Sequence, residues 1–188
     1  MKITATRLDI PDVVLLHHEA FEDERGYFME VFKTTAFAEL GLPDTFVQLN
    51  ESRSARDVVR GLHFQWDPPM GKLMRVVEGS AFLVAVDIRH GSPTLGKWVA
   101  QTMSANEKKQ LWAPAGFARG LCALSDGTRV QYLCTGTYNG RAEAGIRWND
   151  PTIGIQWPIA NPQLSGKDAG APTLNEWLAR PESKAFSV

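Results

Sequence analysis

The chain has 188 residues, of which 44% are hydrophobic. This is enough for one full hydrophobic core, so residues 1–188 are predicted to form a single domain. Its 20 Lys and Arg residues against 21 Asp and Glu residues argue against a nucleic-acid polymer as the main partner, because polymer binding depends on neutralising many phosphates.

Short segments rich in β-branched and aromatic residues, bounded by turn residues about every ten positions, are typical of an antiparallel sandwich or barrel. In chain order, the pattern predicts a helix at Thr34–Leu40, strands at Arg75–Val77, Ala81–Ile88, Lys97–Met103, Gln110–Ala113, Arg129–Thr137 and Gly145–Trp148, and a short helix at Thr173–Ala179. The turn Ser125-Asp126-Gly127 predicts a hairpin between its flanking segments, since glycine accepts a positive φ. We therefore expect a mainly β fold, a jelly roll or barrel with short peripheral helices, which can hold a small-molecule pocket.

The two cysteines and the hydropathy pattern indicate where the protein works. Cys122 and Cys134 cannot build a disulfide framework, and no Cys/His cluster has zinc spacing, so two buried thiols in a reducing compartment and no structural metal are expected. The longest apolar run, Ala81–Val86, is far shorter than the ~20 residues that span a bilayer. The N-terminus also lacks an apolar signal region. We expect a cytoplasmic protein without a membrane partner.

One histidine lies within a strand-like stretch, Arg60 to Gln65. Strand alternation places His63 and Gln65 on one face and Leu62 and Phe64 on the other, so the polar face would line the barrel interior if the apolar face packs outward. Both a structural and a functional histidine fit this pattern. A cupin-type metal site would need a second histidine where Gln65 stands, and His17, His18 and His90 fall in turns or at strand ends, so metal binding is not favoured.

Three further residues are candidates for chemistry, each with a plainer alternative. Lys72 opens an apolar strand and is either a fixed charge inside the barrel or a side chain that reaches water. Tyr132 shares a face with Val130 and Cys134 and is either a core residue or a phenol acid. Asp168 is placed in a loop, where acids usually cap or are solvated.

The turn Asp23-Glu24-Arg25-Gly26 joins an arginine to the flanking aromatic residues Phe21 and Phe28. Such a set can stack a nucleobase and hold a phosphate, although surface turns of this content are common.

Eight blocks, in order along most of the chain, resemble the dTDP-4-dehydrorhamnose 3,5-epimerase family. They are FEDERG from Phe21, VQLN from Val47, RGLHFQ from Arg60, GKLMRVVEG from Gly71, VAVDIRHGSPTLGKW from Val84, LWAPAGFARG from Leu111, IRWNDPTIGIQWP from Ile146 and LSGKDAGAPTL from Leu164. The resemblance implies a cupin-type jelly roll, usually a homodimer, that works without metal or organic cofactor. It implies epimerisation of dTDP-4-dehydro-6-deoxy-glucose at C3 and C5, giving dTDP-4-dehydro-rhamnose.

The resemblance also assigns roles to residues. The catalytic histidine falls on His63, its supporting aspartate on Asp168, the lysine near the ketone on Lys72 and the tyrosine acid on Tyr132. Substrate contacts fall on Phe21, Arg25, Phe28, Glu30, Gln48, Asn50, Arg60, Tyr138 and Lys167. The segment from Phe21 to Glu30 is expected to reach a neighbouring subunit's pocket.

One position departs from the family pattern. After Gly116-Phe117-Ala118 many members carry a second histidine, whereas this chain has Arg119. An arginine stays charged and cannot act as a base, although it can hold a phosphate or the keto oxygen of the sugar. The difference leaves open a mono-epimerase that inverts C3 or C5 only. A binding barrel without turnover is the alternative from another class.

Overall fold

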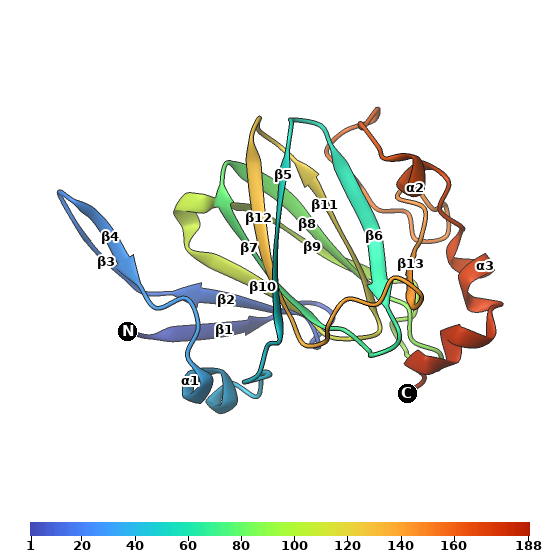
Figure 1. The fold of residues 1–188 in the computed structure, drawn as a ribbon, viewed down its shortest axis with the longest axis horizontal. Coiled ribbons are helices and arrows are strands. Elements are labelled where there is room, and N and C mark those ends of the chain that lie inside the picture. Colours follow the sequence, from blue (N-terminus) through green and yellow to red (C-terminus); the bar gives the residue numbers. More distant parts are fainter.

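Two antiparallel β-sheets, packed face to face, form the body of the computed structural model, which describes residues 1–188 (Figure 1). The six-stranded sheet has the order β1 (Ile3–Arg7), β2 (Val14–His18), β10 (Lys109–Ala113), β7 (Lys72–Glu78), β12 (Thr128–Cys134) and β5 (Gln48–Ser54). The five-stranded sheet has the order β13 (Glu143–Gly145), β6 (Val59–Gln65), β11 (Phe117–Ala123), β8 (Ser80–Asp87) and β9 (Trp98–Ser104). The predicted mainly β jelly roll is confirmed.

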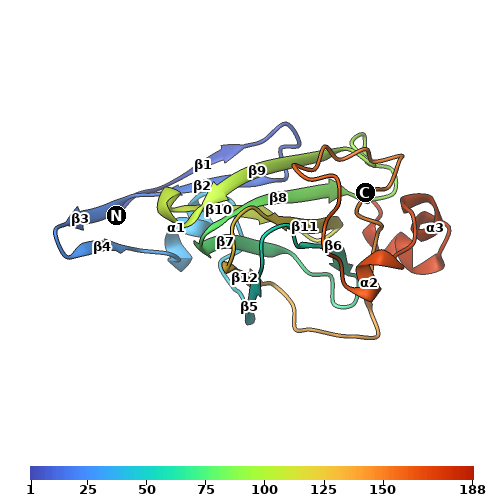
Figure 2. The same cartoon turned by 90° about the horizontal axis from the view of Figure 1, so that it is seen from above.

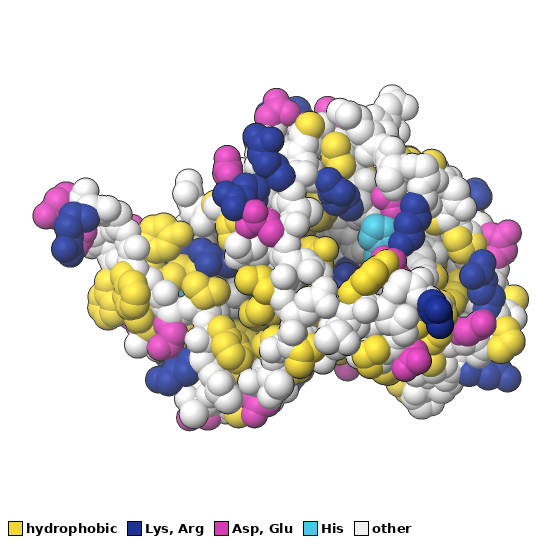
Figure 3. Space-filling view, in the orientation of Figure 1, with side chains coloured by type: hydrophobic (Ala, Val, Ile, Leu, Met, Phe, Trp, Pro, Cys, Tyr) yellow, Lys and Arg dark blue, Asp and Glu magenta, His cyan; other side chains and the backbone are white.

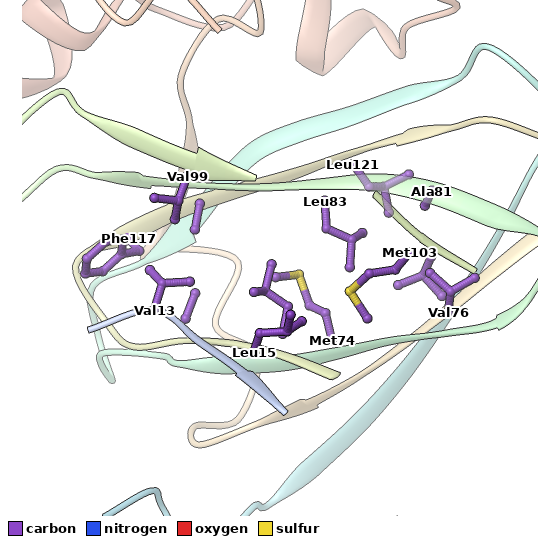
Figure 4. Close-up of a cluster of buried hydrophobic side chains, with 14 of the residues drawn as sticks. Val13, Leu15, Met74, Val76, Ala81, Leu83, Val99, Met103, Phe117 and Leu121 are labelled. Carbon is purple, nitrogen blue, oxygen red and sulfur yellow. The ribbon is translucent and has the colours of Figure 1, made fainter. Parts of the chain in front are cut away.

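The main hydrophobic core lies between the two sheets (Figure 4). Strand β8 shows how alternation builds it: Ala81, Leu83 and Ala85 point into this core, while Val84 and Val86 belong to a second cluster on the outer face of the sheet. Both faces of β8 are therefore buried, which explains why its sequence is almost continuously apolar.

Short helices cover the outer faces of the sheets (Figure 2). They are α1 (Thr34–Glu39), α2 (Gly166–Ala169) and α3 (Leu174–Leu178), with the 3-10 turns η1 (Ala105–Glu107) and η2 (Pro181–Phe186). Trp177 of α3 stacks against Phe64 of β6, with ring centroids 4.5 Å apart. The apolar face of β6 thus packs outward, which is the condition under which strand alternation turns His63 toward the barrel interior. No helix here has the length and apolar character needed to cross a membrane.

A two-stranded hairpin, β3 (Ala20–Asp23) and β4 (Gly26–Met29), projects away from the barrel at the end opposite α2 and α3 (Figures 1 and 2). Neither of its strands pairs with a strand of the two main sheets. Phe21, Tyr27 and Phe28 on this hairpin are more than half exposed, at 63%, 52% and 68%. Exposing these apolar side chains to water is unfavourable, which indicates that this hairpin contacts another molecule.

Several predicted elements need correction. The segments around Ser125-Asp126-Gly127 do not form a hairpin, because β11 pairs with β6 and β8 whereas β12 pairs with β5 and β7. Gly127 does adopt the expected positive φ of 70°, but the turn carries the chain from one sheet to the other. The strand predicted at Gly145–Trp148 lies earlier, at Glu143–Gly145, and β12 ends at Cys134. Both cysteines are free and buried, as predicted.

Candidate active site

Two adjoining hollows of about 260 and 300 Å³ open between the sheets and share the side chains of His63, Lys72, Tyr132 and Glu143. Figure 3 looks toward this cavity, where a histidine is visible beneath basic side chains. The five-stranded sheet contributes His63 from β6, Glu143 from β13 and Arg119 from β11. The six-stranded sheet contributes Lys72 from β7 and Tyr132 from β12. Groups from the two sheets therefore face a ligand from opposite sides.

The backbone around His63 depends on a glycine. Gly61 has a φ of +107°, which L side chains rarely adopt, and a Cβ there would lie 2.6 Å from the backbone oxygen of Arg119. This close approach accompanies a register shift between β6 and β11, beyond which His63 pairs with Arg119. The RGLHF sequence thus places the histidine and the arginine side by side on neighbouring strands.

His63 forms a tight pair with Asp168. Its Nε2 lies 2.5 Å from Oδ1 of Asp168, and the second carboxylate oxygen, Oδ2, accepts a hydrogen bond of 2.8 Å from the Ser165 hydroxyl. Burial opposes ionisation of Asp168, but the hydrogen bonds from His63 and Ser165 outweigh it and hold the pKa of the carboxyl below its ordinary value. A carboxylate on Nε2 fixes the ring and leaves Nδ1 without a hydrogen-bond partner in the protein.

The sequence analysis placed Asp168 in a loop, and the structure corrects this. This residue belongs to the one-turn helix α2, whose N-cap Ser165 accepts a hydrogen bond from the backbone N–H of Asp168. The carboxylate is almost fully buried behind His63, with its side chain 6% exposed.

Lys72 points into the barrel, which excludes the reading as a strand-end side chain that reaches water. Burial, followed by the nearby charge of Arg119, lowers its pKa to about 8. Its Nζ lies 4.7 Å from the centre of the Tyr132 ring, and it has no carboxylate partner. At neutral pH the amine is therefore mostly charged, and it faces the cavity without a carboxylate partner.

Tyr132 is both a core residue and a residue of the cavity, the two alternatives that its sequence pattern left open. Its ring packs against the main core, while its side chain also lines both hollows. Burial raises the pKa of the phenol, so the hydroxyl stays protonated at neutral pH and can act as a proton donor.

Arg119 is 4% exposed and lines the same cavity. Its Nη1 donates to the backbone oxygens of Met70 at 2.8 Å and Pro114 at 3.1 Å. Burial lowers its pKa to about 10, so the guanidinium is charged at neutral pH.

Glu143 is a cavity residue that the sequence analysis missed. Its Oε2 accepts hydrogen bonds from Lys167 Nζ at 2.7 Å and from the Tyr138 hydroxyl at 3.1 Å. A carboxylate at the third position of the stretch RAEAG, alternating with alanines, was the signal that could have pointed to it. The contact also places Lys167 and Tyr138, two predicted binding residues, beside the cavity.

Other predicted binding residues lie around the same cavity. Gln48 and Asn50 on β5 line one hollow and are joined by a hydrogen bond of 2.9 Å. Gln48 also accepts a hydrogen bond from the backbone N–H of Tyr138. Arg60 lines the other hollow, and its Nε donates to the Ser54 hydroxyl at 2.9 Å.

Four predicted residues are not brought to this cavity within one chain. Phe21, Arg25 and Phe28 line a separate hollow on the projecting hairpin, and Arg25 is paired with Asp23 at 2.5 Å. Glu30 lies at the base of the hairpin, where its backbone oxygen contacts His18 Nδ1 at 3.0 Å. These residues do not take part in the cavity of their own chain.

Comparison with known proteins gives one consistent family. The family model described as dTDP-4-dehydrorhamnose 3,5-epimerase matches residues 7–176. A protein of that name from Shigella flexneri is 49% identical over 164 residues, which cover 86% of this chain and 91% of that relative. One from Neisseria gonorrhoeae is 51% identical over 165 residues, which cover 87% of this chain but only half of that longer relative.

Solved structures agree with the sequence comparison. A Legionella pneumophila dTDP-6-deoxy-D-glucose-3,5-epimerase in complex with dTDP-4-keto-L-rhamnose has a TM-score of 0.92 and 42% identity, with 97% of each chain covered. A 3'-monoepimerase from Streptomyces bikiniensis in complex with dTDP-quinovose has a TM-score of 0.84 and 33% identity, covering 89% of this chain and 86% of that one.

Proposed function

The chain belongs to the dTDP-4-dehydrorhamnose 3,5-epimerase family, and we propose that it is an isomerase that converts dTDP-4-dehydro-6-deoxy-D-glucose to dTDP-4-dehydro-L-rhamnose. The observation that carries the proposal is the arrangement of the cavity: a histidine held by a buried aspartate lies on one sheet and a protonated tyrosine on the other, with a buried lysine beside the tyrosine. Relatives at 46–51% identity carry the 3,5-epimerase name, which favours inversion at both carbons.

The chemistry follows from the acidity of hydrogens next to a ketone. Removal of a proton from C3 or C5 leaves an enolate, whose charge rests largely on the oxygen at C4. His63 removes the proton through Nδ1, and Asp168 stabilises the imidazolium that forms. Lys72 donates to the C4 oxygen as charge develops there. Tyr132 returns a proton from the opposite sheet, which inverts the carbon.

Deuterium exchange tests this function directly. In deuterium oxide, the protein should introduce deuterium at both C3 and C5 of the 4-keto substrate, and proton NMR of the product after reduction of the ketone gives its stereochemistry. Exchange at one carbon only would identify a mono-epimerase. Tight binding of the nucleotide sugar without any exchange would identify a binding barrel and overturn the proposal.

The charge on Lys72 gives the reaction a specific pH dependence. Because the pKa of Lys72 is lowered to about 8, this side chain is charged below that pH and loses its charge as pH rises through it. We expect kcat/KM for exchange to decline on the alkaline side near pH 8, well below the pH of about 10.5 at which an ordinary lysine loses its charge. Lys72→Met should be slower throughout and lack this decline. A flat profile up to about pH 10 in the wild type would contradict the prediction.

We further propose that the protein is a homodimer in which the projecting hairpin completes the partner's cavity. The exposed Phe21 and Phe28, together with Arg25, offer a stacking surface and a cation that their own cavity does not use. Affinity for dTDP should therefore fall when the protein is diluted to monomers, measured by ultracentrifugation and fluorescence titration in parallel. Equal affinity in monomer and dimer would contradict this exchange of hairpins.

The compartment is also a proposal. Two free, buried thiols fit a reducing environment, so we propose that the protein acts in the cytoplasm. Recovery of the protein in the cytosolic fraction of cells tests this, and recovery in a membrane or secreted fraction would contradict it.

A further inference from the structure

A buried side-chain amide, that of Gln65, joins β6 to the segment that carries Tyr138. Gln65 is the last residue of β6 and is 3% exposed. Its Nε2 donates to the backbone oxygens of Thr137 at 2.9 Å and Pro68 at 3.0 Å, and its Oε1 accepts from the backbone N–H of Asn139 at 2.8 Å. Both N–H groups of the amide and its oxygen are therefore used, which fixes the orientation of the amide.

Two of these hydrogen bonds fix the backbone at Tyr138. The oxygen of Thr137 belongs to the peptide group before Tyr138, and the N–H of Asn139 belongs to the peptide group after it. Because peptide groups are planar, φ and ψ of Tyr138 are the only soft rotations between these two groups. A single side chain that holds both groups therefore restricts both angles of Tyr138.

Tyr138 lies at the rim of the cavity with its ring accessible. It lines the hollow that also contains Gln48 and Asn50, and the residue is 63% exposed. Its hydroxyl donates to Glu143, which holds the outer end of the ring. Residues 135–142, which link β12 to β13, form neither helix nor strand, so no backbone ladder holds this segment in place. An aromatic ring held at the rim of a pocket offers a flat surface on which a nucleobase can stack.

We propose that Gln65 is a positioning residue for nucleotide binding, whose amide holds Tyr138 in the conformation that stacks on the base of the dTDP-sugar. The proposal rests on the proposed function for the identity of this ligand. Gln65 stands where a cupin metal site would need its second histidine. A neutral imidazole offers one donor and one acceptor and could not form the three hydrogen bonds of this amide. The glutamine at this position is therefore explained by the segment that it holds.

Substitution of Gln65 with methionine keeps the length of the side chain and removes all three hydrogen bonds. In Gln65→Met, the affinity for dTDP should fall and KM for the 4-keto substrate should rise by about 10- to 100-fold, the range that base stacking supplies. The kcat for deuterium exchange should stay within about threefold of the wild type, because the amide acts on binding and not on the proton transfers. Gln65→Glu should lose at least as much affinity, since it turns a carboxylate oxygen toward two carbonyl oxygens.

The matched control is Gln131→Met. The amide of Gln131 donates to Glu51 at 2.9 Å outside the cavity, so dTDP affinity and exchange should both be unchanged. Wild-type affinity in either Gln65 variant would overturn the proposal. A fall in kcat at unchanged KM would also overturn it, because Gln65 would then act on the catalytic groups.

A double variant shows whether Gln65 acts through Tyr138. Tyr138→Ala alone should weaken dTDP binding by about 10- to 100-fold, through the loss of stacking. If the amide acts through this ring, Gln65→Met should cause a further loss of no more than about threefold when the ring is already absent. Losses that multiply in the double variant would show that Gln65 acts independently of the ring and would overturn the proposal.

A measurement on the wild-type protein keeps the proposal testable if the Gln65 variants do not fold. The backbone N–H of Asn139 lies outside any strand, yet its buried acceptor on Gln65 should slow its hydrogen exchange, measured by NMR, by about 10²-fold or more. The backbone N–H of Arg56, which binds the exposed Asp126, should exchange faster. Unprotected exchange at Asn139 would overturn the proposal. Protein that shows this protection and binds dTDP, but introduces no deuterium at C3 or C5, would instead refute the epimerase function alone.

Discussion

Replacing His63 with asparagine should lower the rate of deuterium exchange at both C3 and C5 by about 10²–10⁴-fold, which is the usual contribution of a general base. Exchange at both carbons should fall together, because His63 is the histidine that lines the cavity. Asparagine is preferred to alanine because it leaves a smaller void beside the buried Asp168 and keeps a polar side chain in the cavity.

The matched control for this prediction is His17→Asn. His17 also lies on a strand, β2, but its side chain forms no hydrogen bond and does not line the cavity. This control should exchange deuterium at the wild-type rate, and both variants should bind dTDP as the wild type does. Loss of exchange at one carbon only in His63→Asn would show that a different group removes the other proton.

The sequence was most informative where a residue's role follows from its own strand. Alternation placed His63 on the face of β6 opposite Leu62 and Phe64, and the apolar run after Lys72 placed that lysine at the start of β7. The same reasoning failed for strands that line the cavity or the surface. β5 has the sequence QLNESRS and is polar on both faces, because one face lines the cavity and the other is exposed to solvent. It therefore lacks the apolar pattern from which a strand is predicted.

Contacts between distant segments were beyond any local pattern. Asp168 is separated by 105 residues from His63, and only the packing of α2 against β6 brings their side chains together. Local reading therefore placed Asp168 in a solvated loop. The false hairpin at Ser125-Asp126-Gly127 has the same origin: a tight turn fixes the local backbone, but whether the flanking strands pair or enter different sheets is decided by their other neighbours.

The second large effect is expected from Asp168→Asn, which keeps the size of the side chain but reverses one hydrogen bond. As a carboxylate, Asp168 accepts the proton on His63 Nε2, and the lone pair of Nδ1 is then free to act as a base. An asparagine that turns its NH₂ group toward Nε2 requires an acceptor there, which moves the ring proton to Nδ1. The nitrogen facing the substrate then carries a proton and cannot remove one. A comparable aspartate-to-asparagine change in a serine protease triad lowers kcat by about 10⁴-fold, and we expect about 10³–10⁴-fold slower exchange here.

Two further variants separate this tautomer effect from a loss of structure. Ser165→Ala removes the hydrogen bond to the other oxygen of Asp168 and the N-cap of α2, but it leaves the carboxylate that faces His63 at 2.5 Å, so exchange should fall by about tenfold or less. Asp126→Asn alters an exposed aspartate that binds only the backbone N–H of Arg56, and it should have no effect on exchange. All three proteins should unfold near the wild-type temperature and bind dTDP normally. If Asp168→Asn exchanged deuterium within about tenfold of the wild type, the aspartate would not set the tautomer of His63, and the base would have to act through Nε2 or lie elsewhere in the cavity.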